Sequence, residues 1–312
     1  MKIGLISNPR SRANRKSGGA VARVSPGADI LTASPHDHDQ LAADLTRFAR
    51  AGVGLIAIDG GDGTVRDIVT DIHLAYGDDW PLFTLLPSGK TNVIAGQVGH
   101  FGPGYKGWQN LLAARDQGRL GAQVSLCPAL EVSWPGRVES VRRGFLLGCA
   151  AFSDGIRMAN ETIHPMGFFK GLAVALTILG VLRRNLSGGE NGAGEAGEVL
   201  VDGARVNGAR HFVTMASTLD RLTLGLRPFR QRGEGDINWL DIAAPPQSVL
   251  RGCLMLALGR HRDWMEPAGY ASGCARMLDL HFDQPFTLDG ELYDPHGHIR
   301  VAASRPIRFL RG

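Results

Sequence analysis

The first third of the chain alternates short apolar runs with segments of helical periodicity. Residues 53–58 form a continuous, β-branched apolar run, which is typical of a parallel strand buried on both faces. The whole pattern predicts strands at 3–7, 29–32, 53–58 and 82–86 and helices at 39–51, 65–74 and 91–98. Strands that alternate with helices in this way indicate an α/β domain with a doubly wound parallel sheet. Such sheets bind ligands at the carboxyl ends of their strands.

The pattern changes near residue 123, where strand-like segments separated by turn signals replace the alternation. These segments predict an antiparallel β-sandwich, and they lie at 124–134, 141–149, 198–206, 211–217, 237–243, 276–282, 285–288 and 299–302. One long helical insertion is expected at about 165–184, followed by a glycine-rich loop at 187–197. We therefore expect three parts, namely an α/β domain at 1–122, a β-rich domain at 123–300 and a tail at 301–312 that returns to the first domain.

Composition supports two ordinary cores in a chain of 312 residues, of which 44% are hydrophobic and 21% are charged. The net charge of +4 is too small to demand a nucleic acid, and no interleaving of basic and aromatic residues suggests one. Residues 1–28 nevertheless carry only basic charges, at Lys2, Arg10, Arg12, Arg15, Lys16 and Arg23. This start favours binding of phosphate or attraction to an anionic membrane surface.

The four cysteines are scattered without metal-binding spacing, which is typical of reduced thiols in a cytoplasmic protein. The longest uncharged apolar run, residues 171–182, is shorter than the roughly 20 residues that span a bilayer. We therefore expect a cytoplasmic protein that is peripheral to the membrane. The sequence sets no oligomeric state.

The strongest chemical motif is Ile58-Asp59-Gly60-Gly61-Asp62-Gly63-Thr64, between a predicted buried strand and a predicted helix. Glycines let the backbone approach a polyphosphate, and the following helix presents free N–H groups and the positive end of its dipole. Asp62 is suited to order Mg²⁺ or accept a proton, and Thr64 to bind phosphate. A plain strand–turn–helix connection is the alternative, because Asp-Gly favours turns.

A second turn, at residues 86–92, also lies between a strand and a helix and contains Gly89-Lys90-Thr91. It resembles the end of a P-loop, but a P-loop requires glycine at position 84, where the chain has Thr84. Lys90 is still suited to place a charge on a phosphate. The alternative is a helix start capped by Thr91 or Asn92.

Two further motifs are weak when taken alone. Asn8-Pro9 marks a turn after the first strand, with basic residues behind it. Asp289-Gly290-Glu291 places two carboxylates around a glycine in the second domain. A kinase needs a carboxylate to accept the proton of the acceptor hydroxyl, although an Asp-Gly hairpin turn explains the same residues equally well.

Together, in order and spacing, these four motifs resemble the diacylglycerol kinase catalytic-domain family, which includes sphingosine and ceramide kinases and bacterial relatives. The resemblance implies a first domain similar to those of phosphofructokinases and NAD kinases. It also implies an ATP-dependent lipid kinase that uses Mg²⁺ and transfers the γ-phosphate to a hydroxyl of diacylglycerol, ceramide or a sphingoid base.

The resemblance implies a role for each motif residue. ATP would contact Asn8, Thr32, Gly60, Gly61, Asp62, Gly63, Thr64, Arg66, Lys90 and Asn92. Glu291, helped by Asp289, or else Asp62 would accept the proton of the acceptor hydroxyl. Asp62 and, by a looser match, Asp236 would bind metal. The lipid would contact Asp154, which matches an acid near the acceptor head group, and an almost wholly apolar helix at 166–182 that contains Phe168 and Leu172.

The sequence departs from the family pattern at two places near the nucleotide phosphates. Lys90 replaces the usual threonine, and Arg66-Asp67 replaces the usual Asn-Glu pair. These departures leave open a non-catalytic lipid-binding relative. The shared superfamily leaves open a second alternative, an NAD kinase-like enzyme for a small metabolite. The apolar segment at 166–182 argues against the NAD kinase, although such a helix is equally typical of ordinary core.

Overall fold

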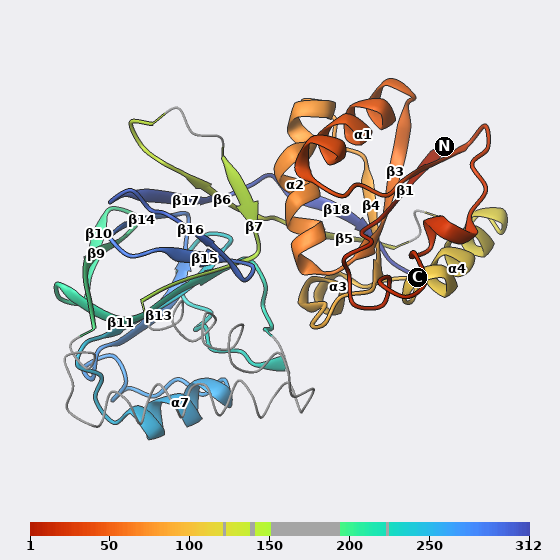
Figure 1. The fold of residues 1–312 in the computed structure, drawn as a ribbon. Helices are drawn as coiled ribbons and strands as arrows, with labels where there is room; N and C mark the ends of the chain where they lie inside the picture. The colour runs from red at the N-terminus through yellow and green to blue at the C-terminus, as the bar shows by residue number, and fades with distance from the viewer. Residues whose placement is uncertain (121–122, 138–140, 151–193, 223–224) are drawn as a thin grey trace. The chain divides into compact units, whose positions relative to one another are not determined.

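The computed structural model describes residues 1–120, 123–137, 141–150, 194–222 and 225–312 (Figure 1). The chain divides into two compact units. The first comprises Met1–Ala129 and Ser304–Gly312, and the second comprises Leu130–Ala303. A mostly parallel sheet in the first unit and an antiparallel, curled sheet in the second confirm the predicted fold class.

The first unit is built on a six-stranded sheet with the order β2-β1-β3-β4-β18-β5. All neighbouring strands are parallel except β5, which runs antiparallel to β18. The strands are β1 (Lys2–Ser7), β2 (Ile30–Ala33), β3 (Val53–Gly60), β4 (Leu82–Pro87), β5 (Val124–Cys127) and β18 (Ile307–Leu310). The helices are the 3-10 turn η1 (Val21–Arg23), α1 (His38–Arg50), α2 (Asp62–Tyr76), α3 (Val93–Val98) and α4 (Gly104–Asp116).

The predicted helix at 39–51 is confirmed as α1, and its sequence explains its place. Asp37 caps it by accepting a hydrogen bond from the Gln40 N–H at 2.8 Å. Leu41, Leu45 and Phe48 recur at helical spacing and are buried. The Phe48 ring occupies the space beside Gly4, where an added Cβ would lie 2.4 Å from a ring carbon. Close packing of α1 on β1 therefore depends on a glycine in the strand.

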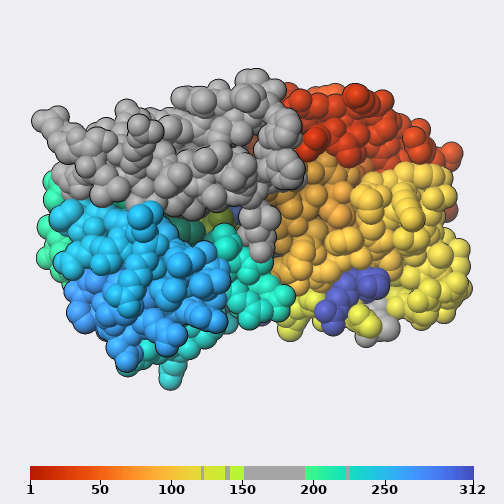
Figure 2. All heavy atoms as spheres, turned by 90° about the horizontal axis from the view of Figure 1, so that it is seen from below, coloured from red at the N-terminus to blue at the C-terminus, as the bar shows by residue number. Residues whose placement is uncertain are grey.

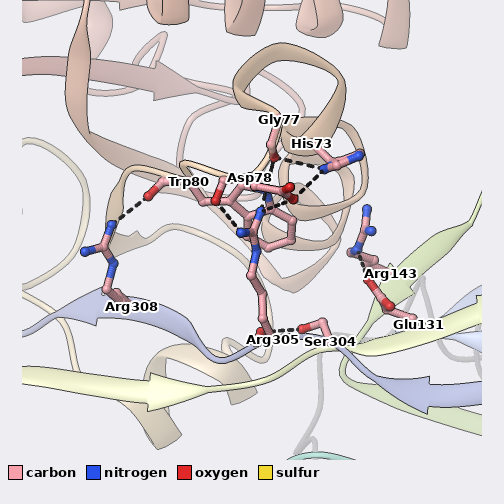
Figure 3. A network of polar contacts seen from close by, with 9 residues as sticks. All are labelled: His73, Gly77, Asp78, Trp80, Glu131, Arg143, Ser304, Arg305 and Arg308. Carbon is pink, nitrogen blue, oxygen red and sulfur yellow. Dashed lines mark hydrogen bonds and ion pairs between the residues drawn. The ribbon is translucent and has the colours of Figure 1, made fainter.

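The C-terminal strand β18 lies inside the first sheet, with Phe309 opposite Phe83 of β4. Figure 3 shows that Arg305, just before β18, and Arg308, within it, contact the turn after α2. The Arg305 guanidinium lies 4.4 Å from the Trp80 ring and donates to the carbonyls of Gly77 and Asp78. Arg308 donates to the Trp80 carbonyl at 2.8 Å. The strand β18 near the C-terminus therefore belongs to the same sheet as the N-terminal strand β1.

Two parts of the sequence prediction for this region are wrong. A single strand was predicted at 124–134, but β5 ends at Cys127 in the first unit and β6 begins at Leu130 in the second. Pro128 separates them, because proline has no N–H to donate to a strand ladder. Helix α4 was not predicted, since two glycines in its first turn obscure the apolar spacing of Trp108, Leu111 and Ala114.

The second unit has a twelve-stranded sheet whose main path is β16-β15-β8-β11-β9-β14-β17-β6-β7, with β10 beside β9 and β12 between β11 and β13. Its strands are β6 (Leu130–Ser133), β7 (Arg142–Gly144), β8 (Leu146–Ala150), β9 (Glu195–Val201), β10 (Ala204–Val206), β11 (Arg210–Ser217), β12 (Ile237–Ala243), β13 (Tyr270–Ala275), β14 (Met277–Phe282), β15 (Phe286–Leu288), β16 (Glu291–Tyr293) and β17 (Ile299–Ala303). Its described helix is α7 (Val249–Ala257). A core of buried side chains that includes Trp134, Phe282 and Phe286 lies within the curl.

Candidate functional site

Three loops meet at the carboxyl ends of β1, β3 and β4 in the first unit. The Asn8 N–H donates to the Asp59 carbonyl at 2.9 Å, and the Ser88 N–H donates to the Gly60 carbonyl at 2.8 Å. The Asn8 side-chain amide donates to the Thr64 hydroxyl at 2.8 Å. The three motifs that the sequence analysis singled out in this domain therefore form one cluster, at the sheet edge where such folds bind ligands.

The loops after β3 and β4 touch through two glycines. A Cβ added to Gly61 would lie 2.9 Å from the Gly89 Cα, and one added to Gly89 would lie 2.6 Å from the Gly61 Cα. Both contacts are to backbone, which cannot move aside as a flexible side chain can. Only glycines allow this approach, which brings the turn after β4 against the start of α2.

We predict that Gly89→Ala will separate these loops and lower the free energy of unfolding by about 1–3 kcal/mol, the usual cost of overpacking. Chemical denaturation monitored by circular dichroism measures this change. Gly96→Ala is the matched control, because Gly96 lies in α3 and its Cβ would have no neighbour within 4 Å. Equal unfolding free energies of the two variants would contradict the close packing of the loops.

The Asp62 carboxylate joins the loop after β3 to α3. Its Oδ2 accepts from the Thr91 hydroxyl at 3.0 Å, and its Oδ1 accepts from the Ile94 N–H at 3.1 Å. Asp62 therefore caps the start of α3 from another helix. Its half-buried position leaves the carboxylate able to face a ligand as well.

Asp59, which the sequence analysis includes in the loop motif without a role, holds the cluster together. Its carboxyl group is fully buried and accepts from the Ser7 hydroxyl at 2.8 Å, the Ala20 N–H at 2.7 Å and the Ser88 hydroxyl. Its backbone carbonyl accepts from the Asn14 amide at 3.1 Å. The available signal was an acid at the end of a wholly apolar strand, because such a residue needs partners when it is buried.

The remaining predicted nucleotide contacts differ in their surroundings. Lys90 is exposed in the turn after β4. Asn92 has a left-handed backbone (φ 52°), and its side chain accepts from the Gly89 N–H at 2.9 Å, so it shapes the turn. Arg66 is buried and donates to the Asp67 carboxylate at 2.7 and 3.0 Å. Thr32 lies in β2, opposite Leu5 of β1, and its carbonyl accepts from Arg47 at 2.8 Å.

Ser88 also lines a pocket beside the loop cluster. The wall includes Ser17, Gly19 and Arg23 from the segment after β1, and Tyr105 and Lys106 from the start of α4. The Arg23 guanidinium lies 5.5 Å from the centre of the Tyr105 ring. Two cations and the amino end of a helix give this pocket a positive character that suits an anion.

In the second unit, Asp289 and Glu291 belong to a tight hairpin between β15 and β16. Asp289 and Gly290 both have positive φ, at 49° and 86°, which is the geometry of a two-residue hairpin turn. The Asp289 carboxylate accepts from the N–H groups of Phe145 and Leu146, each at 2.9 Å. Asp289 thus fixes the turn against the segment between β7 and β8, while Glu291 is exposed at the start of β16.

The predicted metal and lipid contacts are only partly described. Asp62 lies in the first unit, whereas Asp236 is exposed directly before β12 in the second. Asp154, Phe168 and Leu172, together with the predicted helix at 165–184, lie outside the described residues. Among the residues that the structure describes, no group of three or more His, Cys, Asp or Glu side chains is placed to hold a metal ion.

Comparison with known proteins supports the motif resemblance. Residues 2–120 match the family model described as "Diacylglycerol kinase catalytic domain". The similarity to this family is therefore shown for residues 2–120. The match covers β1 to α4 and all three loops of the cluster, so it confirms the resemblance for this part of the chain. No curated protein matches the sequence.

Solved structures resemble the whole chain in fold. A candidate diacylglycerol kinase from Bacillus anthracis str. Sterne aligns with a TM-score of 0.67 and 12% identity, covering 100% of this chain and 95% of that one. A structure described as a diacylglycerol kinase from the same strain gives a TM-score of 0.62 and 12% identity, covering 100% and 97%. At this identity the likeness shows the fold, which extends the match beyond the catalytic-domain segment to the antiparallel unit.

Proposed function

We propose that the protein is an ATP-dependent lipid kinase that transfers the γ-phosphate of ATP to a lipid hydroxyl, with diacylglycerol as the first acceptor to test. The observation that carries the proposal is the glycine-to-glycine contact of Gly61 and Gly89 at the start of α2, in a segment that matches the diacylglycerol kinase family. This contact places two glycine-containing turns together at the N-terminus of a helix, which suits a polyphosphate.

In this proposal the ATP phosphates lie over the loop at residues 60–64, where Thr64 and Asn8 supply polar contacts and Lys90 supplies a positive charge. The positive pocket beside Ser88 receives another part of the nucleotide. Asp62 is the carboxylate of the cluster that suits Mg²⁺, which usually takes one or two protein carboxylates together with substrate phosphates. When bound, Mg²⁺ would neutralise charge that develops on the transferred group.

The second unit supplies the acceptor side. We assign Glu291 as the group that accepts the proton of the lipid hydroxyl, with Asp289 holding its hairpin in position. The hydroxyl oxygen forms a bond to the γ-phosphorus, the bond from that phosphorus to the bridging oxygen breaks, and ADP leaves with the bond electrons. The residues contribute mainly positioning and charge stabilisation, because phosphoryl transfer requires little covalent chemistry from a protein.

The test is incubation of purified protein with radiolabelled ATP, Mg²⁺ and mixed micelles that contain diacylglycerol, ceramide or sphingosine. We expect label in one lipid and none when Mg²⁺ is removed with a chelator. NAD is added to a parallel sample as a soluble acceptor. The Asp62→Asn variant serves as a control for chemistry in the loop cluster.

Each outcome separates the proposal from its two alternatives. Label in NAD and in no lipid would replace the lipid kinase with an NAD kinase-like enzyme. No label in any acceptor, with no thermal shift on adding Mg²⁺ and ATP, would indicate a non-catalytic lipid-binding relative. The thermal-shift measurement is needed because Lys90 and Arg66 depart from the family pattern. The hydrogen bonds of Arg66 to Asp67 nevertheless give this arginine a structural role of its own.

A further inference from the structure

Helix α7 in the second unit exposes a stripe of leucines. Leu250 and Leu254 of α7 and its C-cap residue Leu258 are 64%, 56% and 54% exposed, and their spacing of four residues places them along one side. At a rise of 1.5 Å per residue this stripe is about 12 Å long. Single exposed leucines are ordinary, but an aligned set on one helix indicates an interaction surface.

The opposite face of α7 is fixed to the core of its own unit. Leu256 is buried in a cluster with Met265 and Tyr270. Gly252 lies against the Tyr270 ring, where an added Cβ would be 2.4 Å from a ring atom. The Tyr270 hydroxyl donates to the Gln247 carbonyl at 2.7 Å. Because these contacts hold the helix by its inner face, the leucine stripe is not required for core packing and points outward.

The charges within the segment that carries the stripe are basic. Residues 248–262 contain Arg251, Arg260 and Arg262, all exposed, and no Asp or Glu; the next acids along the chain are Asp263 and Glu266, and Glu266 pairs with Arg230 at 3.7 Å. The Arg251 guanidinium lies 4.4 Å from the centre of the Trp264 ring, which holds it near the helix. An apolar face flanked by arginines complements a bilayer with anionic head groups, as in helices that lie in the membrane interface.

A second copy of the chain fits this surface less well. A twofold contact through the stripe would bring the same arginines of both copies toward one another, because such an interface is self-complementary. Like charges in a contact of this size oppose association.

No helix that the structure describes is long and apolar enough to cross a membrane. Figure 2 shows the light-blue atoms around residue 250 at the surface of the second unit.

We propose that the leucine face of α7 is the membrane-docking surface of the second unit, with the leucines at the acyl boundary and the arginines at the level of anionic head groups. This inference rests on the proposed function, because a lipid kinase must meet its acceptor in a bilayer. It goes further by assigning the contact to named residues outside the loop cluster and the Asp289 hairpin.

Vesicle sedimentation without ATP tests the docking surface independently of turnover. We expect the double variant Leu254→Gln/Leu258→Gln to bind vesicles of phosphatidylcholine and phosphatidylglycerol roughly ten- to thirtyfold more weakly, since each leucine loses the burial of its exposed half. The matched control is Leu74→Gln/Leu126→Gln, which changes leucines that are 80% and 65% exposed in the first unit. The control should bind as the wild type does.

A second variant tests the charge. Arg260→Gln/Arg262→Gln should weaken binding to vesicles with phosphatidylglycerol by roughly fivefold per arginine, and change binding to pure phosphatidylcholine little. Equal losses in the Leu254/Leu258 variant and its control would overturn the proposal. So would a wild-type dimer in light scattering that the Leu254/Leu258 variant abolishes, because the stripe would then be an interface between copies. A protein that labels no lipid but still binds vesicles through α7 would refute the kinase assignment and leave the docking surface standing.

Discussion

Replacing Glu291 with glutamine should lower kcat by roughly 10²–10⁴-fold, the usual contribution of general acid–base catalysis. Glutamine keeps the size of the side chain but cannot accept a proton from the lipid hydroxyl. Glu291 is exposed at the start of β16, so the melting temperature should change little. The measurement is steady-state phosphorylation of the accepted lipid, with kcat and KM determined separately.

Asp289→Asn is the matched control, because the two acids are neighbours in one hairpin and differ in their contacts. Asparagine tolerates the positive φ of this position. It replaces one carboxylate oxygen with an amide that cannot accept from both the Phe145 and Leu146 N–H groups. We expect a loss of about 1–3 kcal/mol in the free energy of unfolding together with reduced activity. Stability therefore separates the positioning residue from the proton acceptor.

If Glu291→Gln keeps the activity of the wild type, its assignment as the base is wrong. Asp62 then becomes the residue to examine, since its carboxylate in the loop cluster is half-buried, whereas that of Asp59 is fully buried. The Asp62→Asn variant must be compared at equal stability, because the Asp62 carboxylate also accepts from the Ile94 N–H and the Thr91 hydroxyl. A fall in kcat beyond the effect on folding would move the proton transfer to Asp62.

The parallel sheet could be predicted because the local sequence pattern of its strands agrees with their burial in the folded domain. Residues 53–60 are apolar, β-branched and buried, and the glycines that follow start α2, so periodicity and turn chemistry indicate the same element. The position of β18 could not be predicted from local pattern. The four residues of β18 pair along their length with β5, and Phe309 lies opposite Phe83 of β4, so their place depends on strands that are distant in the sequence.

The residues that make up the loop cluster could be predicted, but their separate tasks could not. Motif spacing predicts Gly61, Asp62 and Asn92 as neighbours of a ligand, and the structure brings the three residues together. It does not reveal that Asn92 shapes the Gly89 turn or that Asp62 caps α3. These hydrogen bonds join residues of different elements, so their geometry depends on how the strands are ordered in the sheet. The role of Asp59 was missed for the same reason, since its partners come from two other loops.

The loss of Asp59 should have the largest effect on stability in the first unit. Asp59→Ala removes one acceptor from three buried donors, the hydroxyls of Ser7 and Ser88 and the Ala20 N–H. An unsatisfied buried donor costs about 1–3 kcal/mol. Because the hydroxyls can rotate toward other acceptors, we expect a total loss of about 3–5 kcal/mol in the free energy of unfolding. Urea denaturation monitored by circular dichroism measures this loss.

Asp59→Asn provides the matched comparison, because the amide keeps the shape of the carboxyl group and one acceptor oxygen. Its NH₂ group can donate to a serine hydroxyl that turns to accept, so we expect a loss of about 1–2 kcal/mol. Both variants should also weaken the thermal shift on adding Mg²⁺ and ATP, since Asp59 ties the segment after β1 to the turn after β4. If Asp59→Ala costs less than Asp59→Asn, the carboxyl group does not hold these loops, and their arrangement must depend on the glycine contact of Gly61 and Gly89 instead.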